Sequence, residues 1–231
     1  MRNTIAVFKN QINELLADKE QLLIFIIFPV LGFFQTRMVE LDEGVYPYQI
    51  VLAVASMFAS SVMIMALPQI IAEHRENGSL RFMVMSGIKP TSYLVGVGGF
   101  FLVLNILVAG FFAWLGELQG EALWRFLLAF LLAVTCAILV GMVLGVLSKN
   151  RQKAISLAMP IGMGIMLLPM FVEIIEPLQP VLEILYIDRV ANMMQEIKTG
   201  IPLTDMYVVL VNIAVLLLVF AVLFKKKGMK A

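Results

Sequence analysis

Side chains that could carry chemistry are few in this sequence. Its 231 residues include one histidine, His74, and one cysteine, Cys136. The long apolar segments hold no cluster of histidine, cysteine and carboxylate and no charge at their centres. This pattern argues against a metal centre, against an enzyme that uses a nucleophile and against a proton relay. No Gly-x-x-x-x-Gly-Lys-Ser/Thr motif for holding nucleotide phosphates occurs. The sequence therefore predicts no catalytic residue, no metal and no cofactor bound by this chain.

A mixed stretch at residues 73–90, EHRENGSLRFMVMSGIKP, is the strongest candidate for a functional contact. It combines charges, a glycine and apolar side chains, and it separates two long apolar runs. Charged groups typically set the specificity of a protein contact, and apolar groups that fill a groove supply affinity. The pattern predicts a short helix at a membrane face that docks on another protein. The alternative is a solvated loop without a partner, because such a loop can have the same composition.

Methionines in the run 154–172 form a second candidate site. Met159, Met163, Met166 and Met170 recur at intervals of four, three and four, which places them on one helical face, with Phe171 beside them. Flexible thioethers repack around apolar ligands of different shapes. The stripe is therefore a candidate path for a hydrophobic molecule, although packing against helices or lipid produces the same spacing.

The elements that must position these residues are membrane spans. The sequence is 61% hydrophobic with a mean hydropathy of +0.95, above the roughly 45–50% apolar usage of soluble domains. A helix needs about 20 apolar residues to cross a hydrocarbon core of about 30 Å. Six runs free of Asp, Glu, Lys and Arg are candidates, and the first is short: 21–36, 44–72, 90–116, 126–148, 154–172 and 206–224.

The charges predict an orientation for these spans. If the amino terminus is cytoplasmic, all but four of the 17 lysines and arginines lie on the inner side, and all but five of the 16 acidic residues lie outside. This distribution follows the positive-inside rule and predicts that both termini are cytoplasmic. The net charge of +1 gives no indication of a nucleic-acid partner. The basic residues predicted outside are Arg37, Arg125, Arg189 and Lys198.

Three smaller segments complete the predicted layout. Residues 1–20 place apolar side chains at helical spacing and predict an amphipathic helix on the inner membrane surface, or a simple anchor. Residues 173–205 contain an apolar stretch too short to cross, which fits helices that re-enter the membrane or a simple outer loop. Lys225, Lys226 and Lys227 end the last span and favour contact with anionic lipid.

The mixed stretch also carries a family resemblance. The letters ENGSL at residues 76–80, followed by KPTSY at 89–93 and by Gly96, resemble the loop after the second span of ATP-binding-cassette type-2 (ABC-2) permeases. Judged by the layout of spans, the resemblance extends over the whole chain. In that family the loop forms a coupling helix that docks on a separate ATPase subunit. The implied ATPase-coupling residues are Glu73, Arg75, Glu76, Gly78, Leu80, Phe82 and Met83.

The resemblance implies a function as well. The second and fifth spans of such permeases line a path between two permease halves, which adds Met57, Met63 and Met65 to the methionine stripe. The chain is then a single transmembrane permease domain at residues 1–231, in the plasma membrane, paired with an identical or similar permease subunit. ATP and magnesium are bound by the ATPase. The cargo expected for an uncharged path is a hydrophobic or amphipathic drug, lipid or peptide. The alternative is a membrane scaffold or sensor that recruits a cytosolic partner without transport.

The sequence thus predicts an all-α integral membrane protein. It has six transmembrane helices, an N-terminal amphipathic helix at 1–20, a cytoplasmic coupling helix within 73–90 and re-entrant outer helices within 173–205.

Overall fold

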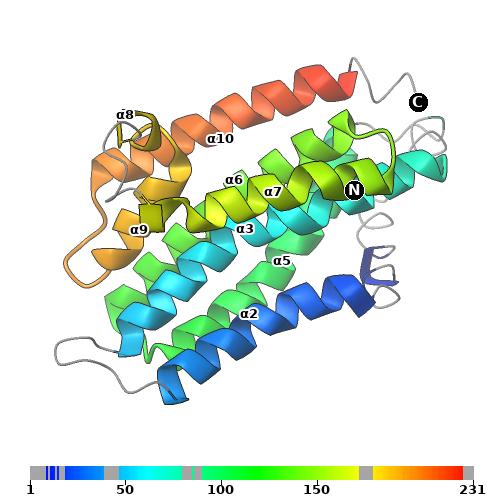
Figure 1. The fold of residues 1–231 in the computed structure, drawn as a ribbon. Coiled ribbons are helices and arrows are strands. Elements are labelled where there is room, and N and C mark those ends of the chain that lie inside the picture. Colours follow the sequence, from blue (N-terminus) through cyan, green and yellow to red (C-terminus); the bar gives the residue numbers. More distant parts are fainter. Residues whose placement is uncertain are drawn as a thin grey trace.

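The computed structural model describes residues 9, 11–13, 15, 19–38, 47–79, 85, 90–171 and 179–225. Within these ranges the protein is built from helices and contains no β-strand, which confirms the all-α prediction. The main helices run side by side (Figure 1). The helices are α2 (Lys19–Met38), α3 (Pro47–Glu76), α5 (Pro90–Leu115), α6 (Gly120–Leu147), α7 (Arg151–Phe171), α8 (Gln179–Leu182), α9 (Tyr186–Gln195) and α10 (Leu203–Leu223).

Four of the described helices are long and apolar enough to cross a membrane: α3, α5 from Val95, α6 and α10. The apolar part of α2, Leu22–Thr36, is shorter, and α7 begins with the charged residues Arg151 and Lys153. A membrane protein with several spans is therefore supported. The larger count of six crossings stays a prediction, although each predicted run falls largely within a helix.

Helix α3 lies at the centre of the bundle. It contacts α2, α5, α6, α7 and α9, and every side chain from 58 to 72 is buried. Near its middle, the Phe58 ring lies 5.6 Å from Phe28 of α2, 5.8 Å from Phe112 of α5 and 6.1 Å from Phe130 of α6, measured between centroids. Tilted and offset aromatic pairs of this kind add to the packing energy. A displacement of α3 must therefore be accommodated by its neighbours on several sides.

Two glycines allow α6 to approach α3 closely. A Cβ atom on Gly141 would lie 2.6 Å from the carbonyl oxygen of Met63, and one on Gly145 would lie 2.7 Å from Cβ of Ile71. Distances below about 3 Å do not occur between such atoms, so a larger side chain would push the helices apart. The two glycines thus form a small-xxx-small pair that serves packing of α6 against α3.

The two ends of the bundle differ in charge. We call one the basic end, where α3 and α10 finish and α2 and α7 begin (Figure 1). It carries Lys19, Arg75, Lys149, Arg151, Lys153 and Lys225. The opposite, acidic end carries Glu117, Glu121, Glu183, Asp188, Glu196 and Asp205. The charges are thus segregated as the sequence predicts. That the basic end faces the cytoplasm stays a prediction.

Candidate functional site

Helix α3 continues through the first residues of the mixed stretch. Glu73, His74, Arg75 and Glu76 form its last turn, and His74 is only 5% exposed. Packing of α3 against its neighbours, including α6, keeps this turn helical. The helix ends at Glu76, and Gly78, just beyond it, has a φ of 70°, the left-handed conformation that favours glycine after a helix end.

Arg75 joins the end of α3 to the end of α6. Its Nη1 donates hydrogen bonds to the carbonyl oxygens of Val146 at 3.1 Å and Ser148 at 3.3 Å. The last carbonyls of a helix have no partner within it and carry partial negative charge, so a guanidinium is a favourable neighbour. Arg75 therefore provides hydrogen bonds to the last carbonyls of α6, although it precedes Val146 by 71 positions in the chain.

Two glutamates of the same turn contact the beginning of α7. Glu73 Oε2 lies 3.3 Å from Nη1 of Arg151, and Glu76 Oε2 accepts the backbone N–H of Arg151 at 3.0 Å. Carboxylates at a helix N-terminus are stabilised by its dipole and its unpaired N–H groups. The ion pair itself is partly exposed, with 34% and 41% of the two side chains accessible, so its own contribution is modest. Together these contacts fix the α6–α7 connection to the end of α3.

A buried polar chain connects α3 to α5 and to the N-terminal segment. Nδ1 of His74 lies 3.1 Å from the hydroxyl of Tyr93, and its Nε2 lies 3.5 Å from Nε2 of Gln11. All three side chains are buried, and the Tyr93 ring packs 5.9 Å from that of Phe224. Because Tyr93 belongs to the first turn of α5, this chain holds together the two helices that flank residues 77–89.

The structure thus gathers part of the predicted coupling set. Glu73, Arg75, Glu76 and Gly78 lie at the basic end, where the three charged side chains contact α6 and α7. Leu80, Phe82 and Met83 lie outside the described residues. Sequence reasoning missed the roles of Arg151, His74 and Tyr93. Arg151 was visible only as one of several inner basic charges, and no local spacing connects it with Glu73, 78 residues away.

The predicted path methionines lie on more than one face. Met63 is 1% exposed, and its backbone carbonyl lies beside Gly141 of α6. Met65 faces α7, where a Cβ on Gly162 would lie 2.5 Å from its Cγ. Met57, Met159 and Met166 are half-buried, and Met163 is 52% exposed. The side chains of Met170 and Phe171 lie outside the described residues. The structure brings the second and fifth predicted spans together, and the role of these methionines in a path stays a prediction.

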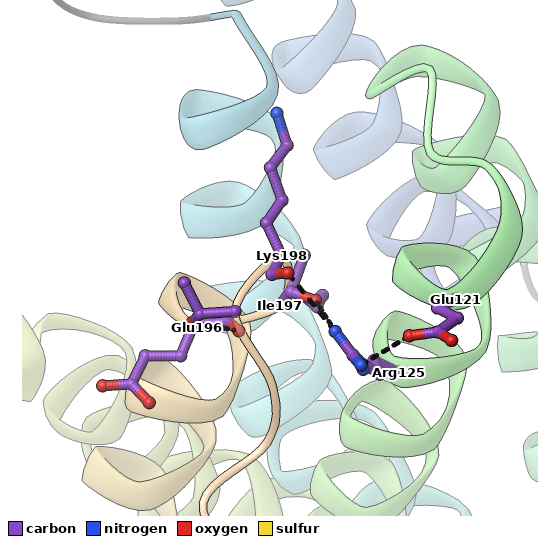
Figure 2. A network of polar contacts seen from close by, with 6 residues as sticks. Glu121, Arg125, Glu196, Ile197 and Lys198 are labelled. Carbon is purple, nitrogen blue, oxygen red and sulfur yellow. Dashed lines mark hydrogen bonds and ion pairs between the residues drawn. The ribbon is translucent and has the colours of Figure 1, made fainter.

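At the acidic end, Arg125 connects α6 to the turn after α9. Its Nη1 donates to the carbonyl oxygens of Ile197 and Lys198 at 3.3 Å each, and its Nη2 lies 2.6 Å from Oε2 of Glu121 (Figure 2). Glu196 points away from this group. The ammonium of Lys198 lies 3.5 Å from the ring centroid of Tyr48 on α3, a cation–π contact. The turn is therefore fixed to both α3 and α6.

Helix α9 is held at its other end as well. The Tyr186 hydroxyl donates to the carbonyl oxygen of Ser60 at 2.8 Å. Arg189 lies 3.1 Å from the carboxylate of Asp205 on α10 and donates to the carbonyl oxygen of Glu183 at 2.8 Å. The apolar side of α9 is buried against α3, α6 and α10: Tyr186, Ile187, Val190, Met193 and Met194.

Asp188 lies on the other side of this short helix. Burial raises the pKa of its carboxyl group above the usual range; Arg189 lowers the pKa, and Asp205 and Glu183 raise it. The carboxylate of Asp188 is therefore less favourable in the folded protein than in water.

Comparison with known families agrees with this architecture. The model of the family described as "ABC-2 family transporter protein" matches residues 6–225, nearly the whole chain. No curated protein matches the chain. Members of this family are the membrane component of a transporter and not its ATPase. Membership therefore implies an ATPase partner. This chain, with its multiple apolar helices and its match over residues 6–225, belongs to the ABC-2 transporter family and is a multi-pass membrane permease.

Proposed function

We propose that this permease is the membrane subunit of an ATP-driven exporter of hydrophobic or amphipathic compounds. Residues 73–90 dock on a separate ATPase subunit, which binds ATP and magnesium. Six helices cross the membrane, both termini lie in the cytoplasm, and a second permease subunit, identical or similar, completes the path. Helix α9 and the segment around it form the re-entrant outer cap.

One observation carries the proposal: three elements meet at the end of α3. Arg75 binds the carbonyls that end α6, and Glu73 and Glu76 bind Arg151 at the start of α7. A force applied to residues 77–89 therefore reaches α3, α6 and α7 together. Packed helices move as units because close-packed interfaces resist gradual deformation. This geometry supports the stretch as the place where ATPase closure is passed to the membrane helices.

The composition of the helices supports the class of cargo. The four candidate spans have apolar centres, and no group of three or more His, Cys, Asp or Glu that could hold a metal occurs in the described part of the chain. The contact of α3 with α7 brings the second and fifth predicted spans side by side, as a path built from both helices requires. Flexible thioethers suit ligands of varied shape. Such a path favours uncharged or amphipathic molecules over ions.

The test is recovery of the ATPase with the tagged permease from its own host in mild detergent. We compare the wild type with Leu80→Asp in the proposed coupling stretch and with Leu203→Asp, a matched change at a side chain that is 77% exposed at the acidic end. We expect an ATPase near one-to-one with the wild type and with Leu203→Asp, and loss of it with Leu80→Asp.

Two results would overturn the proposal. Absence of any ATPase from the wild-type preparation would favour the scaffold or sensor alternative. Equal retention by both variants would remove the coupling role from residues 73–90. ATP-dependent movement of a hydrophobic dye in inverted vesicles then separates a transporter from a protein that only recruits an ATPase.

A further inference from the structure

A cavity of about 430 Å³ lies between α3 and α9 towards the acidic end. This volume lies within the range of small-molecule sites, which is about 300–1,000 Å³. The cavity is lined by five residues of α3 and three of α9: Gln49, Leu52, Ala53, Ser56, Met57, Ala191, Met194 and Gln195. Of the predicted path residues, only Met57 belongs to it.

The cavity lies where the cover over α3 is incomplete. From Phe58 to Ala72 every α3 side chain is buried, and Met65 is covered by α7 at Gly162. Closer to the acidic end, Gln49 and Ala53 are exposed, and Met57 is half-buried. Helix α9 covers this part of α3 only partly, which leaves an open space between them.

The walls of the cavity are held in place. Tyr186 fixes the start of α9 to the Ser60 carbonyl, and Arg125 fixes the turn after α9 through the carbonyls of Ile197 and Lys198. Residues 191–195 therefore lie between two fixed points. A site whose walls are already ordered loses little conformational entropy when a ligand enters.

The lining determines which ligand fits. It includes no Asp, Glu, Lys, Arg or His. Met57, Met194 and Leu52 provide apolar and polarizable surface, while Ser56 and Gln195 provide hydrogen-bonding groups. One turn beyond Ser56 on the same helix face, the Ser60 hydroxyl is buried without a hydrogen-bond partner among the described residues. A charged molecule would lose its hydration here without gaining a counter-charge.

We infer that this α3–α9 cavity binds an uncharged amphipathic small molecule. Met57 and Met194 contact its apolar part, and Ser56 and Gln195 form hydrogen bonds with its polar group. The inference adds to the proposed export function a cargo-binding site near the acidic end. It rests on that function only where it identifies the bound molecule as cargo. Binding itself is measurable without the ATPase.

Protection of an introduced cysteine tests the inference. Ala191→Cys places a thiol in the cavity wall, while the native Cys136 is buried and serves as a silent background. The probe is Nile red, a neutral amphipathic dye, and the readout is the rate of alkylation by N-ethylmaleimide in detergent. At a dye concentration ten times its dissociation constant, we expect alkylation to slow about tenfold.

Three controls distinguish the cavity from general partitioning of the dye. Leu218→Cys, 68% exposed on α10, lies outside the lining of this cavity and should show no protection. Adding Ala53→Trp to Ala191→Cys fills the cavity and should abolish protection. The anionic dye 8-anilinonaphthalene-1-sulfonate should not protect Ala191→Cys.

Three results would overturn the inference: Nile red fails to slow alkylation, protects Leu218→Cys equally, or still protects after Ala53→Trp. These readings are independent of ATPase recovery. If the coupling role proved wrong but Nile red still protected Ala191→Cys, the cavity would remain a binding site whose ligand is not an exported cargo.

Discussion

Arg75 shows how a single side chain connects two helices at the basic end. Its guanidinium meets two carbonyls of the α6 terminus, at 3.1 and 3.3 Å. A hydrogen bond that involves a charged group contributes about 1.5–3 kcal/mol, and removing it leaves carbonyls without a partner. Arg75 was predicted to contact an ATPase. In the structure it is bound within the chain, so its effect on coupling is expected to pass through α6.

Replacing Arg75 tests this assignment. We expect Arg75→Ala to lower stability by about 1–3 kcal/mol, which corresponds to several degrees in the unfolding midpoint of a chain of this size. The buried thiol of Cys136 is the reporter, because it reacts with a fluorogenic maleimide only once the helices separate. Lys153→Ala, at an exposed position on α7, is the control and should unfold with the wild type. An unchanged midpoint for Arg75→Ala would show that the α6 contact contributes little.

Asp188 gives a prediction that depends on pH. Burial raises the pKa of its carboxyl group, so the folded protein binds this proton more tightly than the unfolded chain does. The charged carboxylate therefore destabilises the fold above the raised pKa, and this cost disappears below the ordinary value of 3.8. We expect Asp188→Asn to raise the unfolding midpoint at pH 7, with a smaller gain as the pH falls. Glu196→Gln, at an exposed carboxylate that points away in Figure 2, is the matched control. A gain that grows on acidification would contradict this account.

At the scale of elements, the fold depends on how closely α6 approaches α3. Gly141 and Gly145 lie four residues apart and both face α3, so the two helix backbones come close over a full turn. The pattern was visible in the sequence. Its partner helix was not, because small-xxx-small pairs fit any neighbouring helix.

The effect of an added methyl group depends on whether the glycine lies against another helix, as Gly141 does, or faces open space, as Gly164 does. Gly141→Ala forces a Cβ toward the Met63 carbonyl, and overpacking of this kind costs about 1–3 kcal/mol. Gly164→Ala on α7 is the matched control, because no atom lies within 4 Å of a Cβ there. We expect the cysteine-reactivity midpoint to fall for Gly141→Ala and to stay unchanged or rise for Gly164→Ala, because alanine favours a helix more than glycine does. Equal midpoints would mean that α3 and α6 separate easily.

At the scale of the whole molecule, the charge difference between the ends predicts an orientation. The α5–α6 connection lies at the acidic end and the α6–α7 connection at the basic end. We expect a membrane-impermeant maleimide to label Gln119→Cys in intact cells, and to label Lys149→Cys only after permeabilisation. Both positions are exposed, and the native Cys136 is buried. The reverse labelling pattern would place the basic end outside and remove the proposed site of ATPase docking from the cytoplasm.

The sequence by itself determined the class of the molecule. Long apolar runs can satisfy their backbone groups in a membrane only as helices, so composition was enough to predict an all-α membrane protein. Charge counts separated the two ends. The letters ENGSL and KPTSY were enough to indicate the ABC-2 family, which the match over residues 6–225 supports. The contacts of Leu80, Phe82 and Met83 stay a prediction.

Only the tertiary structure decided which residues meet. Met63 and Met65 are two positions apart on α3, and helical spacing turns them to different faces. That the Met65 side chain lies against Gly162 of α7, while Gly141 of α6 lies beside the Met63 carbonyl, depends on the order of helices around α3. Arg75 and the carbonyl of Val146 are 71 residues apart, and the α3–α9 cavity joins segments more than 130 residues apart. Such pairings leave no local pattern, because side-chain spacing defines a helix face but not the neighbour that covers it.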